Sequence, residues 1–407
     1  MTLRHIQLER IDQSDLQRLV EAAVSESRDI EYKREAYGRS DKDHGEFLAD
    51  VSSFANTVGG DIIIGMAARA GVPTNVVPLN IDVDAEIRRL EEIARSGLQP
   101  RIFGLAARAI PIADGGSVLV IRIPHSYNQP HRIVRQGPGH HRFWARSSAG
   151  KYEPNVDELR LLFTRAPQIA DRVRDFRFDR ITKIVANDGP VPLIDGHMLI
   201  MHVGPLSAFD FGQSFQLDIG QNPHQVFTAF PPLGGQVGHY RINMDGCLVL
   251  SNVQADGKTH RAYAQVFRSG IVEAVASSFL MGDGSTQSPL RLTSIRTEAT
   301  IVKFSHIYLQ ALQARDAVPP YVILVSLVGV KGVPYSFAMG NSVFEDEAGV
   351  LDRDQIHFSE VVIEDVPLDR YEYAKLLRPL LDQTANAAGR AASPSFDHSG
   401  RFCLRVE

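Results

Sequence analysis

The first 165 residues alternate between stretches with apolar positions at helical spacing and short apolar runs that favour strands. Helical spacing over residues 16–24 predicts a helix, with Ser14 and Gln17 as a candidate capping box. Residues 30–32 then predict a short strand, and residues 47–55 form the next apolar helical stripe. The pattern therefore predicts a domain that mixes helices with short strands.

A pair of glycines separates two of these expected elements. Gly59-Gly60 is expected to end the second helix and to lead into a buried strand at residues 61–66. Asn56 and Thr57, just before the pair, are expected to bond to nearby backbone. Further elements expected in this half are a polar mobile loop at 38–45, helices at 84–95 and 156–163, and strands at 118–123 and 141–145. Together they predict an α/β or α+β domain at residues 1–165.

The second half has a different character. Ala166-Pro167 marks the expected boundary, and residues 171–180 form a highly charged connector. Strands expected at 239–243, 247–253 and 260–267 are separated by Met244-Asp245-Gly246 and Ala255-Asp256-Gly257, which predicts an antiparallel meander. Helices are expected at 271–280, 294–315 and 371–386, and a very apolar strand at 321–330. We therefore expect an α+β domain at residues 166–407.

Composition narrows the class of protein. Of the 407 residues, 44% are hydrophobic and 22% are charged, which is ordinary for a globular protein. No apolar run approaches the ~20 residues of a membrane helix, and the N-terminus lacks the apolar core of a secretory signal, so we expect a cytoplasmic protein with no membrane partner. Cys247 and Cys403 are the only cysteines, which excludes a disulfide framework within one chain.

The formal net charge of -5 is unevenly distributed. Residues 1–165 carry 22 Lys plus Arg and 22 Asp plus Glu, so the acidic excess lies in the second half. Residues 115–152 contain no acid at all, which predicts a basic surface that binds phosphates, with aromatic rings that stack on unpaired bases. The candidate nucleic-acid-binding residues are Arg132, Arg135, His140, His141, Arg142, Arg146 and Lys151. The alternative is that Phe143 and Trp144 pack in the core while the arginines lie on different faces.

A second candidate site lies near the N-terminus. Glu31 and Lys33 are two residues apart on the expected strand, so their side chains should share one face, and Glu26 lies across a turn from them. Cleavage of a phosphodiester needs carboxylates that hold Mg²⁺ or Mn²⁺ and a cation that stabilises charge on the phosphate. These residues suit that chemistry, with Glu26, Glu31 and Lys33 as catalytic candidates and both glutamates as metal ligands. The alternative is a solvated strand edge with a local ion pair.

Several segments, in order, resemble the Schlafen-type (AlbA-like) domain, also known as a DNA-binding or "divergent AAA" domain. They are Glu26-Ser27, Glu31-Tyr32-Lys33, Phe54-Ala55-Asn56-Thr57, Gly59-Gly60, Ile64-Gly65, the 118–124 strand, Pro130-His131 and Phe143-Trp144-Ala145-Arg146-Ser147-Ser148. The resemblance covers about residues 15–165. It implies a nucleic-acid-binding fold, and in some members a metal-dependent endoribonuclease that cuts tRNA or rRNA. We recognise no family in the second half.

The resemblance also shows that one acidic residue of the family's nuclease site is missing. Two of the three acidic positions of that nuclease match Glu26 and Glu31, but the third falls at Ala67. Asp50 is a candidate replacement. An ATP site is not supported, because Gly257-Lys258-Thr259 has Asn252 in place of the first P-loop glycine and lies in an expected hairpin turn.

The sequence therefore predicts a protein that binds nucleic acid, RNA in preference to DNA, with an incomplete acidic site that either cleaves RNA or has lost that activity. The alternative is a non-catalytic DNA-binding transcriptional regulator. The second domain is expected to act as a sensor, as a module for an unknown ligand or protein, or in homo-oligomerisation.

Overall fold

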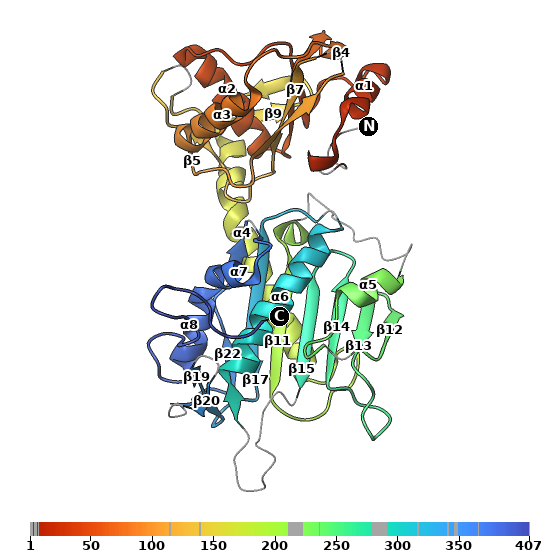
Figure 1. Cartoon of the computed structure of the whole chain (residues 1–407), viewed down its shortest axis with the longest axis vertical. Helices are drawn as coiled ribbons and strands as arrows, with labels where there is room; N and C mark the ends of the chain where they lie inside the picture. The colour runs from red at the N-terminus through yellow and green to blue at the C-terminus, as the bar shows by residue number, and fades with distance from the viewer. Residues whose placement is uncertain are drawn as a thin grey trace. The chain divides into compact units, whose positions relative to one another are not determined.

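The computed structural model divides into two compact units, Met1–Ala170 and Asp171–Glu407. The residues that the structure describes are 3, 6, 8–113, 115–137, 140–210, 223–235, 237–277, 291–315, 317–339, 342–345, 349–364 and 366–406. Both units combine helices with mainly antiparallel sheets, so the fold class is α+β, as expected (Figure 1).

Unit 1 is built on a four-stranded sheet. Its strands, in spatial order, are β1 (Ile30–Lys33), β2 (Gly60–Ile64), β7 (Ser117–Ile123) and β6 (Ala106–Pro111). β1 runs parallel to β2, whereas β2–β7 and β7–β6 are antiparallel. β1 is therefore an edge strand, and its side chains alternate between the two faces of the sheet.

Helices cover both faces of this sheet. Ile62 and Ile64 of β2 pack in a cluster with α2 (Asp41–Ala55) and α3 (Val83–Gly97). Ile63 points to the opposite face, where it packs in a cluster with α1 (Gln13–Glu21). Because β2 is buried on both faces, it reads as a continuous apolar run.

Short strand pairs complete unit 1. They are β3 (Met66–Arg69) with β4 (Val72–Val76), β5 (Leu98–Gln99) with β8 (Arg132–Ile133), and β9 (Ala145–Ser147) with β10 (Gly150–Tyr152). A 3-10 turn at Leu8–Arg10 precedes α1. The 30-residue helix α4 (Val156–Val185) contains residues of both units.

Unit 2 is built on an eight-stranded sheet. The strands are β12 (His239–Ile242), β13 (Gly246–Leu250), β14 (Ala262–Phe267), β15 (Val272–Ser277), β11 (Met198–Pro205), β17 (Tyr321–Val328) and β22 (Gln355–His357), with β23 (Val361–Ile363) also paired to β17. All pairings in this sheet are antiparallel. The expected meander is confirmed at β12–β13–β14.

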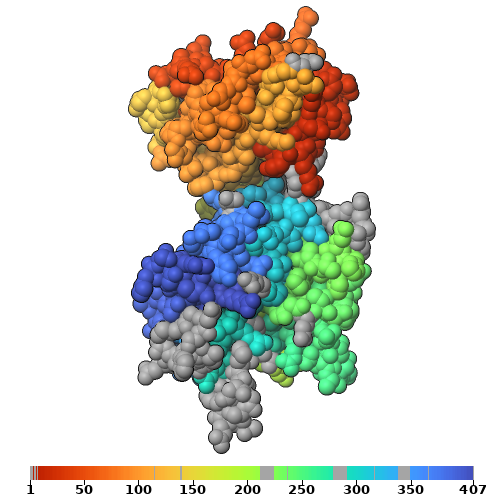
Figure 2. Space-filling view, viewed as in Figure 1, coloured from red at the N-terminus to blue at the C-terminus, as the bar shows by residue number. Residues whose placement is uncertain are grey.

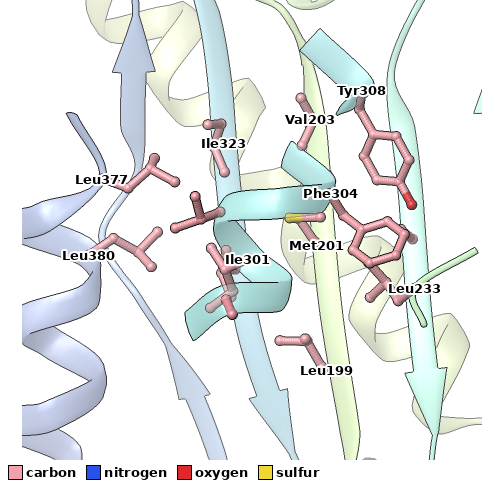
Figure 3. Packing of buried hydrophobic residues seen from close by; sticks show 14 of the residues in the cluster. Leu199, Met201, Val203, Leu233, Ile301, Phe304, Tyr308, Ile323, Leu377 and Leu380 are labelled. Carbon is pink, nitrogen blue, oxygen red and sulfur yellow. The ribbon is translucent and has the colours of Figure 1, made fainter. Parts of the chain in front are cut away.

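The main core of unit 2 lies between this sheet and α6 (Ser294–Gln313). Figure 3 shows Ile301 and Phe304 of α6 facing Leu199 and Met201 of β11. The other helices that contribute to this core are α5 (Pro223–Ala229), α7 (Arg370–Leu376) and α8 (Arg378–Ala387). The C-terminal half of α4 packs on the opposite face of the sheet through Ile181 and Ile184.

Smaller elements surround this core. They are a 3-10 turn at Leu206–Phe209, the strands β16 (Leu292–Thr293), β18 (Pro334–Ser336) and β21 (Gly349–Val350), and the pair β19 (Ala338–Met339) with β20 (Ser342–Glu345). No helix in the described part of the chain is long and apolar enough to cross a membrane.

Expectations about several elements were wrong, and three of them concern helices. Residues 38–45 are not a loop throughout, because Ser40 caps α2 and the helix begins at Asp41. The helix expected at 271–280 is instead β15 over its described part, and residues 278–280 lie outside the described residues. The helix expected at 371–386 is two helices, α7 and α8, which meet at Leu377.

Candidate functional site

The site begins at the edge strand β1. Glu31 and Lys33 pair in register with Ile62 and Ile64, so both side chains point to the face covered by α2. The Lys33 ammonium lies 3.3 Å from a carboxylate oxygen of Glu31. The two-residue spacing therefore produces the shared face that the sequence predicts.

Helix α2 adds two carboxylates that face the same lysine. Lys33 Nζ lies 2.9 Å from Glu46 Oε1 and 3.3 Å from Asp50 Oδ2. Glu46 and Asp50 are four residues apart, which places them on one face of the helix. Three carboxylates from two elements therefore surround one ammonium group.

Asp50 is the buried centre of this arrangement. Its side chain is 1% exposed, whereas that of Glu46 is 46% exposed. Tyr37 donates its hydroxyl to Asp50 at 2.8 Å, and Lys151 of β10 donates to the other carboxylate oxygen at 2.7 Å. A buried carboxylate with hydrogen bonds to both oxygens is satisfied without water.

Arg146 of β9 closes the site from the other side. Its guanidinium is ion-paired with Glu31 and donates to the Ser27 carbonyl at 2.9 Å. The guanidinium carbon lies 4.4 Å from the ring centroid of Phe54, and the side chain is buried. This arginine is therefore held by charge, hydrogen bonds and stacking together.

We call Glu31, Lys33, Glu46, Asp50, Arg146 and Lys151 the carboxylate–lysine cluster. It joins three carboxylates to three cations. Burial alone would lower the pKa of Lys33, but the charge of Asp50 and the hydrogen bond to Glu46 raise it above its ordinary value. Burial, reinforced by the charge of Asp50, raises the pKa of Tyr37 well above its ordinary value. Lys33 therefore stays charged and Tyr37 stays neutral near neutral pH.

Glu26 takes a different role. Its carboxylate accepts the backbone N–H of Tyr32 at 3.0 Å, and its own N–H donates to the Gly71 carbonyl at 2.7 Å. Burial raises the pKa of Glu26, and the charge of Glu31 adds to this rise. Glu26 and Glu31 are thus close enough to repel each other, but Glu26 mainly bridges β1 to the β3–β4 turn.

The donor set does not fit the divalent metal that the resemblance implies. Ala67 lies on β3 with a buried methyl group where the third carboxylate would be, and the oxygens of Glu31 are already bonded to Lys33 and Arg146. Asp61 offers no replacement, because it is buried and paired with Arg122 at 2.8 Å. Among the described residues, no group of three or more His, Cys, Asp or Glu side chains is arranged to hold a metal ion.

The remaining basic candidates gather on one hairpin. The N–H of Ile133 donates to the Arg142 carbonyl, and the N–H of His141 donates to the Ile133 carbonyl, so the two ends of residues 132–143 lie side by side. We call this segment the basic hairpin; its described residues are 132–137 and 140–143. It brings together Arg132, Arg135, His140, His141 and Arg142, with the two imidazole rings in contact at 3.6 Å between centroids and tilted by 33° to each other.

Acids from elsewhere in unit 1 meet several of these cations. Arg135 lies 3.4 Å from Asp41, and Arg142 is ion-paired with Glu153. Arg132 instead donates to the neutral side chain of Gln99 at 2.8 Å. The acid-free stretch is thus partly neutralised in the fold, whereas Arg146 and Lys151 belong to the carboxylate–lysine cluster.

The sequence interpretation predicted the wrong hydrogen-bond partners for Asn56. Instead of bonding to nearby backbone, its amide donates to the carbonyls of His131 at 3.0 Å and Trp144 at 2.9 Å, and accepts the His131 N–H at 2.7 Å. Thr57 does both: its Oγ1 donates to the nearby Ser53 carbonyl at 2.8 Å, as expected, and accepts the distant N–H of Arg146 at 2.9 Å. Trp144 packs against the core cluster of α2 and α3, as the alternative interpretation of the aromatic pair predicted.

Comparisons with known proteins agree with the resemblance. Residues 26–155 match the family model described as Schlafen, AlbA_2, whereas the C-terminal half has no family match. No curated protein matches the chain.

Similar solved structures include two from bacteria. The N-terminal domain of a RecG-related protein from Nitrosomonas europaea is 24% identical, with 32% of this chain and 84% of that chain covered and a TM-score of 0.26. The DIP2311 protein from Corynebacterium diphtheriae is 16% identical, with 40% of this chain and 32% of that chain covered and a TM-score of 0.28. The family match identifies the segment that holds the carboxylate–lysine cluster and the basic hairpin: residues 26–155 are a Schlafen, AlbA_2 domain.

Proposed function

We propose that unit 1 binds nucleic acid, RNA in preference to DNA, through the basic hairpin. The observation that carries this proposal is the convergence of Arg132, Arg142 and the neighbouring rings of His140 and His141 on the two adjacent ends of one hairpin. Arginines that lie together neutralise consecutive phosphates, and imidazole rings stack on unpaired bases. The Schlafen, AlbA_2 match supports a nucleic-acid-related function for the same segment.

The ion pairs of the hairpin do not oppose this function. Arg142 and Glu153 are about half exposed, with 54% and 51% of their side-chain surfaces accessible. Exposed pairs of this kind contribute only about 0–1 kcal/mol, so a phosphate can replace the carboxylate. Arg146, one of the seven residues that the sequence proposed for nucleic-acid binding, is buried under Glu31 and Phe54. We therefore assign it the role of holding the binding surface in place.

Binding is tested with the full chain and fluorescent tRNA, single-stranded DNA and double-stranded DNA over a series of salt concentrations. Arg132→Ala and Arg142→Ala should each weaken binding and reduce the salt dependence by about one phosphate contact. Arg160→Ala is the matched control, since Arg160 forms an exposed pair with Asp157 on α4. Equal affinity of the wild type and both hairpin variants would remove the hairpin from the interface.

The same assay decides between RNA and DNA. Tighter binding of tRNA would support the RNA proposal, whereas tighter binding of double-stranded DNA without any cleavage would favour the alternative, a non-catalytic DNA-binding transcriptional regulator. Unit 2 would then tune binding as a sensor, a partner-binding module or a dimerisation module. Light scattering of the full chain, alone and with RNA, tests the last of these.

A second candidate function is endoribonuclease activity. The observation that favours it is the grouping of Glu31, Glu46 and Asp50 around Lys33, since carboxylates beside an ammonium suit acid–base work and charge stabilisation at a phosphate. Cleavage of tRNA, assayed with and without Mg²⁺ or Mn²⁺ and abolished in Glu31→Ala, would establish it. If the wild type does not cleave but Ala67→Asp does, the missing carboxylate is the deficit; cleavage by Glu31→Ala at the wild-type rate would exclude this site.

A further inference from the structure

A groove lies on unit 1 between α3 and the segment that follows β5. It encloses about 520 Å³ and is lined on the helix side by Arg88, Glu91, Glu92 and Arg95. The opposite wall is formed by residues 101–105. The orange part of the chain, which includes these residues, covers much of the face of unit 1 that is visible in Figure 2. The groove uses none of the residues of the carboxylate–lysine cluster.

An aromatic ring and a guanidinium lie together in the groove wall. Phe103 is 45% exposed, although an aromatic ring of this size is normally buried. The guanidinium carbon of Arg101 lies 5.6 Å from the centroid of that ring. A flat apolar surface beside a positive charge matches the two parts of a nucleotide, because the base stacks on the ring and the phosphate pairs with the cation.

The charge of the groove favours an anion only moderately. It contains three arginines, Arg88, Arg95 and Arg101, against Glu91 and Glu92. Arg95 is ion-paired with Glu92, and both side chains are more than half exposed, so a phosphate can compete for Arg95. The excess of one positive charge is compatible with a phosphodiester, which carries one negative charge per nucleotide.

The groove wall follows closely in sequence on a strand that pairs with the basic hairpin. β5 pairs with β8, and Gln99 of β5 accepts hydrogen bonds from Arg132 at 2.8 Å and 3.3 Å. Arg101 follows Gln99 by two residues, so the groove wall begins just after the strand that pairs with the start of the hairpin. A nucleic-acid strand that contacts Arg132 therefore needs only to run along β5 to reach Phe103.

We infer that this groove is a single-strand subsite, in which one unpaired base stacks on Phe103 while its phosphates contact Arg88 and Arg101. This inference rests on the proposed nucleic-acid binding and deepens it. A paired base presents no free face for stacking, so the subsite selects single-stranded over double-stranded nucleic acid. RNA and DNA single strands both offer unpaired bases and phosphates, so the subsite accepts either.

The test measures the affinity of the full chain for fluorescent single-stranded RNA and DNA of about 16 nucleotides, and for a duplex of the same length. Phe103→Ala should weaken single-strand binding by about tenfold and leave duplex binding unchanged. Arg88→Ala and Arg101→Ala should each reduce the salt slope for single strands by about 0.7. Glu91→Gln, which removes a negative charge from the groove, should tighten binding.

Phe178→Ala is a matched control in unit 2. Phe178 is 48% exposed, and the guanidinium carbon of Arg177 also lies 5.6 Å from its ring centroid. Loss of affinity in Phe103→Ala but not in Phe178→Ala supports the subsite, whereas equal affinities of both variants and the wild type for single strands overturn it. If Phe103→Ala binds normally while Arg132→Ala does not, the subsite fails and the proposed function stands; if the wild type binds no nucleic acid, both fail.

Discussion

The carboxylates of the carboxylate–lysine cluster differ sharply in how firmly their present partners hold them. Asp50 is buried and bonded to Tyr37, Lys33 and Lys151, whereas Glu46 is ion-paired with Lys33 and is half exposed. A buried charge that loses its partners is costly, while an exposed ion pair contributes little. Asp50 therefore acts mainly as a structural anchor, and Glu46 is the carboxylate that is free to respond to a ligand.

Asp50→Ala should destabilise unit 1 by about 3 to 5 kcal/mol, because it leaves the partly buried Lys33 and Lys151 without their shared counter-charge. Urea denaturation followed by the fluorescence of Trp144, the only tryptophan, measures this change. Glu92→Ala, which breaks an exposed pair on α3, is the control and should change stability by less than about 1 kcal/mol. Equal effects of the two substitutions would show that Asp50 is not an anchor.

Glu298 of α6 should make the stability of unit 2 depend on pH. It is fully buried, accepts hydrogen bonds from Ser393 and Thr384, and burial raises its pKa to about 7 from an ordinary value of 4.5. Between these two values the folded protein holds a proton that the unfolded chain has released, so stability falls as pH rises through this window and levels off above about pH 7. The loss amounts to about 3 kcal/mol.

Glu298→Gln should remove this part of the pH dependence. The variant should be more stable than the wild type by up to about 3 kcal/mol at about pH 8, with a difference that shrinks towards about pH 5. Urea denaturation across this pH range provides the measurement. Glu372→Gln, at an exposed glutamate of α7 paired with Lys375, is the matched control and should leave the profile unchanged. Parallel profiles for the wild type and Glu298→Gln would contradict the assignment.

At the same scale, the sequence placed two of the six members of the cluster together. Glu31 and Lys33 could be placed on one face because strand side chains alternate with a period of two. Glu46 was missed because residues 38–45 were interpreted as a loop, which left the start of α2 unrecognised. The four-residue spacing of Glu46 and Asp50 was the available signal, since it places two carboxylates on one helix face. Their meeting with Lys33 depends on how α2 packs on the sheet, which no local pattern contains.

Among the elements of unit 1, the end of α2 is tied to two distant segments through Asn56. Asn56→Ala should destabilise unit 1 by about 2 to 4 kcal/mol, because it leaves the buried N–H of His131 and the carbonyls of His131 and Trp144 without their partner. Urea denaturation measures the loss, and the emission of Trp144 should shift to longer wavelength as its segment loosens.

Asn75→Ala is the control for this element, because Asn75 is an exposed amide on β4. It should change neither the stability nor the emission beyond about 0.5 kcal/mol. If Asn56→Ala matched this control, the amide would not join α2 to the 131 and 144 segments. A stability loss without any change in emission would place the loosening at His131 alone.

The elements that the sequence assigned wrongly share a cause. β15 was expected to be a helix because its residues are buried on both faces, which removes the alternation that marks a half-exposed strand. Its one acid, Glu273, is no sign of exposure, since Arg180 of α4 donates to it at 2.7 Å and 2.8 Å. The charges of residues 171–180, which lie in α4, are no sign of exposure either, since Arg174, Arg177 and Arg180 pair with acids of unit 2. Tertiary partners, absent from a single sequence, decided both.

At the scale of the whole molecule, each unit has its own cores. The two apolar clusters of unit 1 draw their buried residues from positions 3–133, and the two clusters of unit 2 draw theirs from positions 181–406. Composition and the spacing of apolar positions could predict mixed α+β domains. The register and order of the eight-stranded sheet could not be predicted, because strands far apart in sequence, such as β11 and β17, lie next to each other. Separate cores imply separate cooperative units.

The full chain should therefore unfold in two transitions, each assigned by a substitution that touches one unit only. In calorimetry at about pH 8, Asp50→Ala should lower the midpoint of one transition by several degrees and leave the other in place, because its lost ion pairs lie within unit 1. Glu298→Gln should raise the midpoint of the other transition, since the buried charge that it removes lies within unit 2. A single transition that both substitutions shift would show that the units unfold together, and α4, which contains residues of both, would then be the element that couples them.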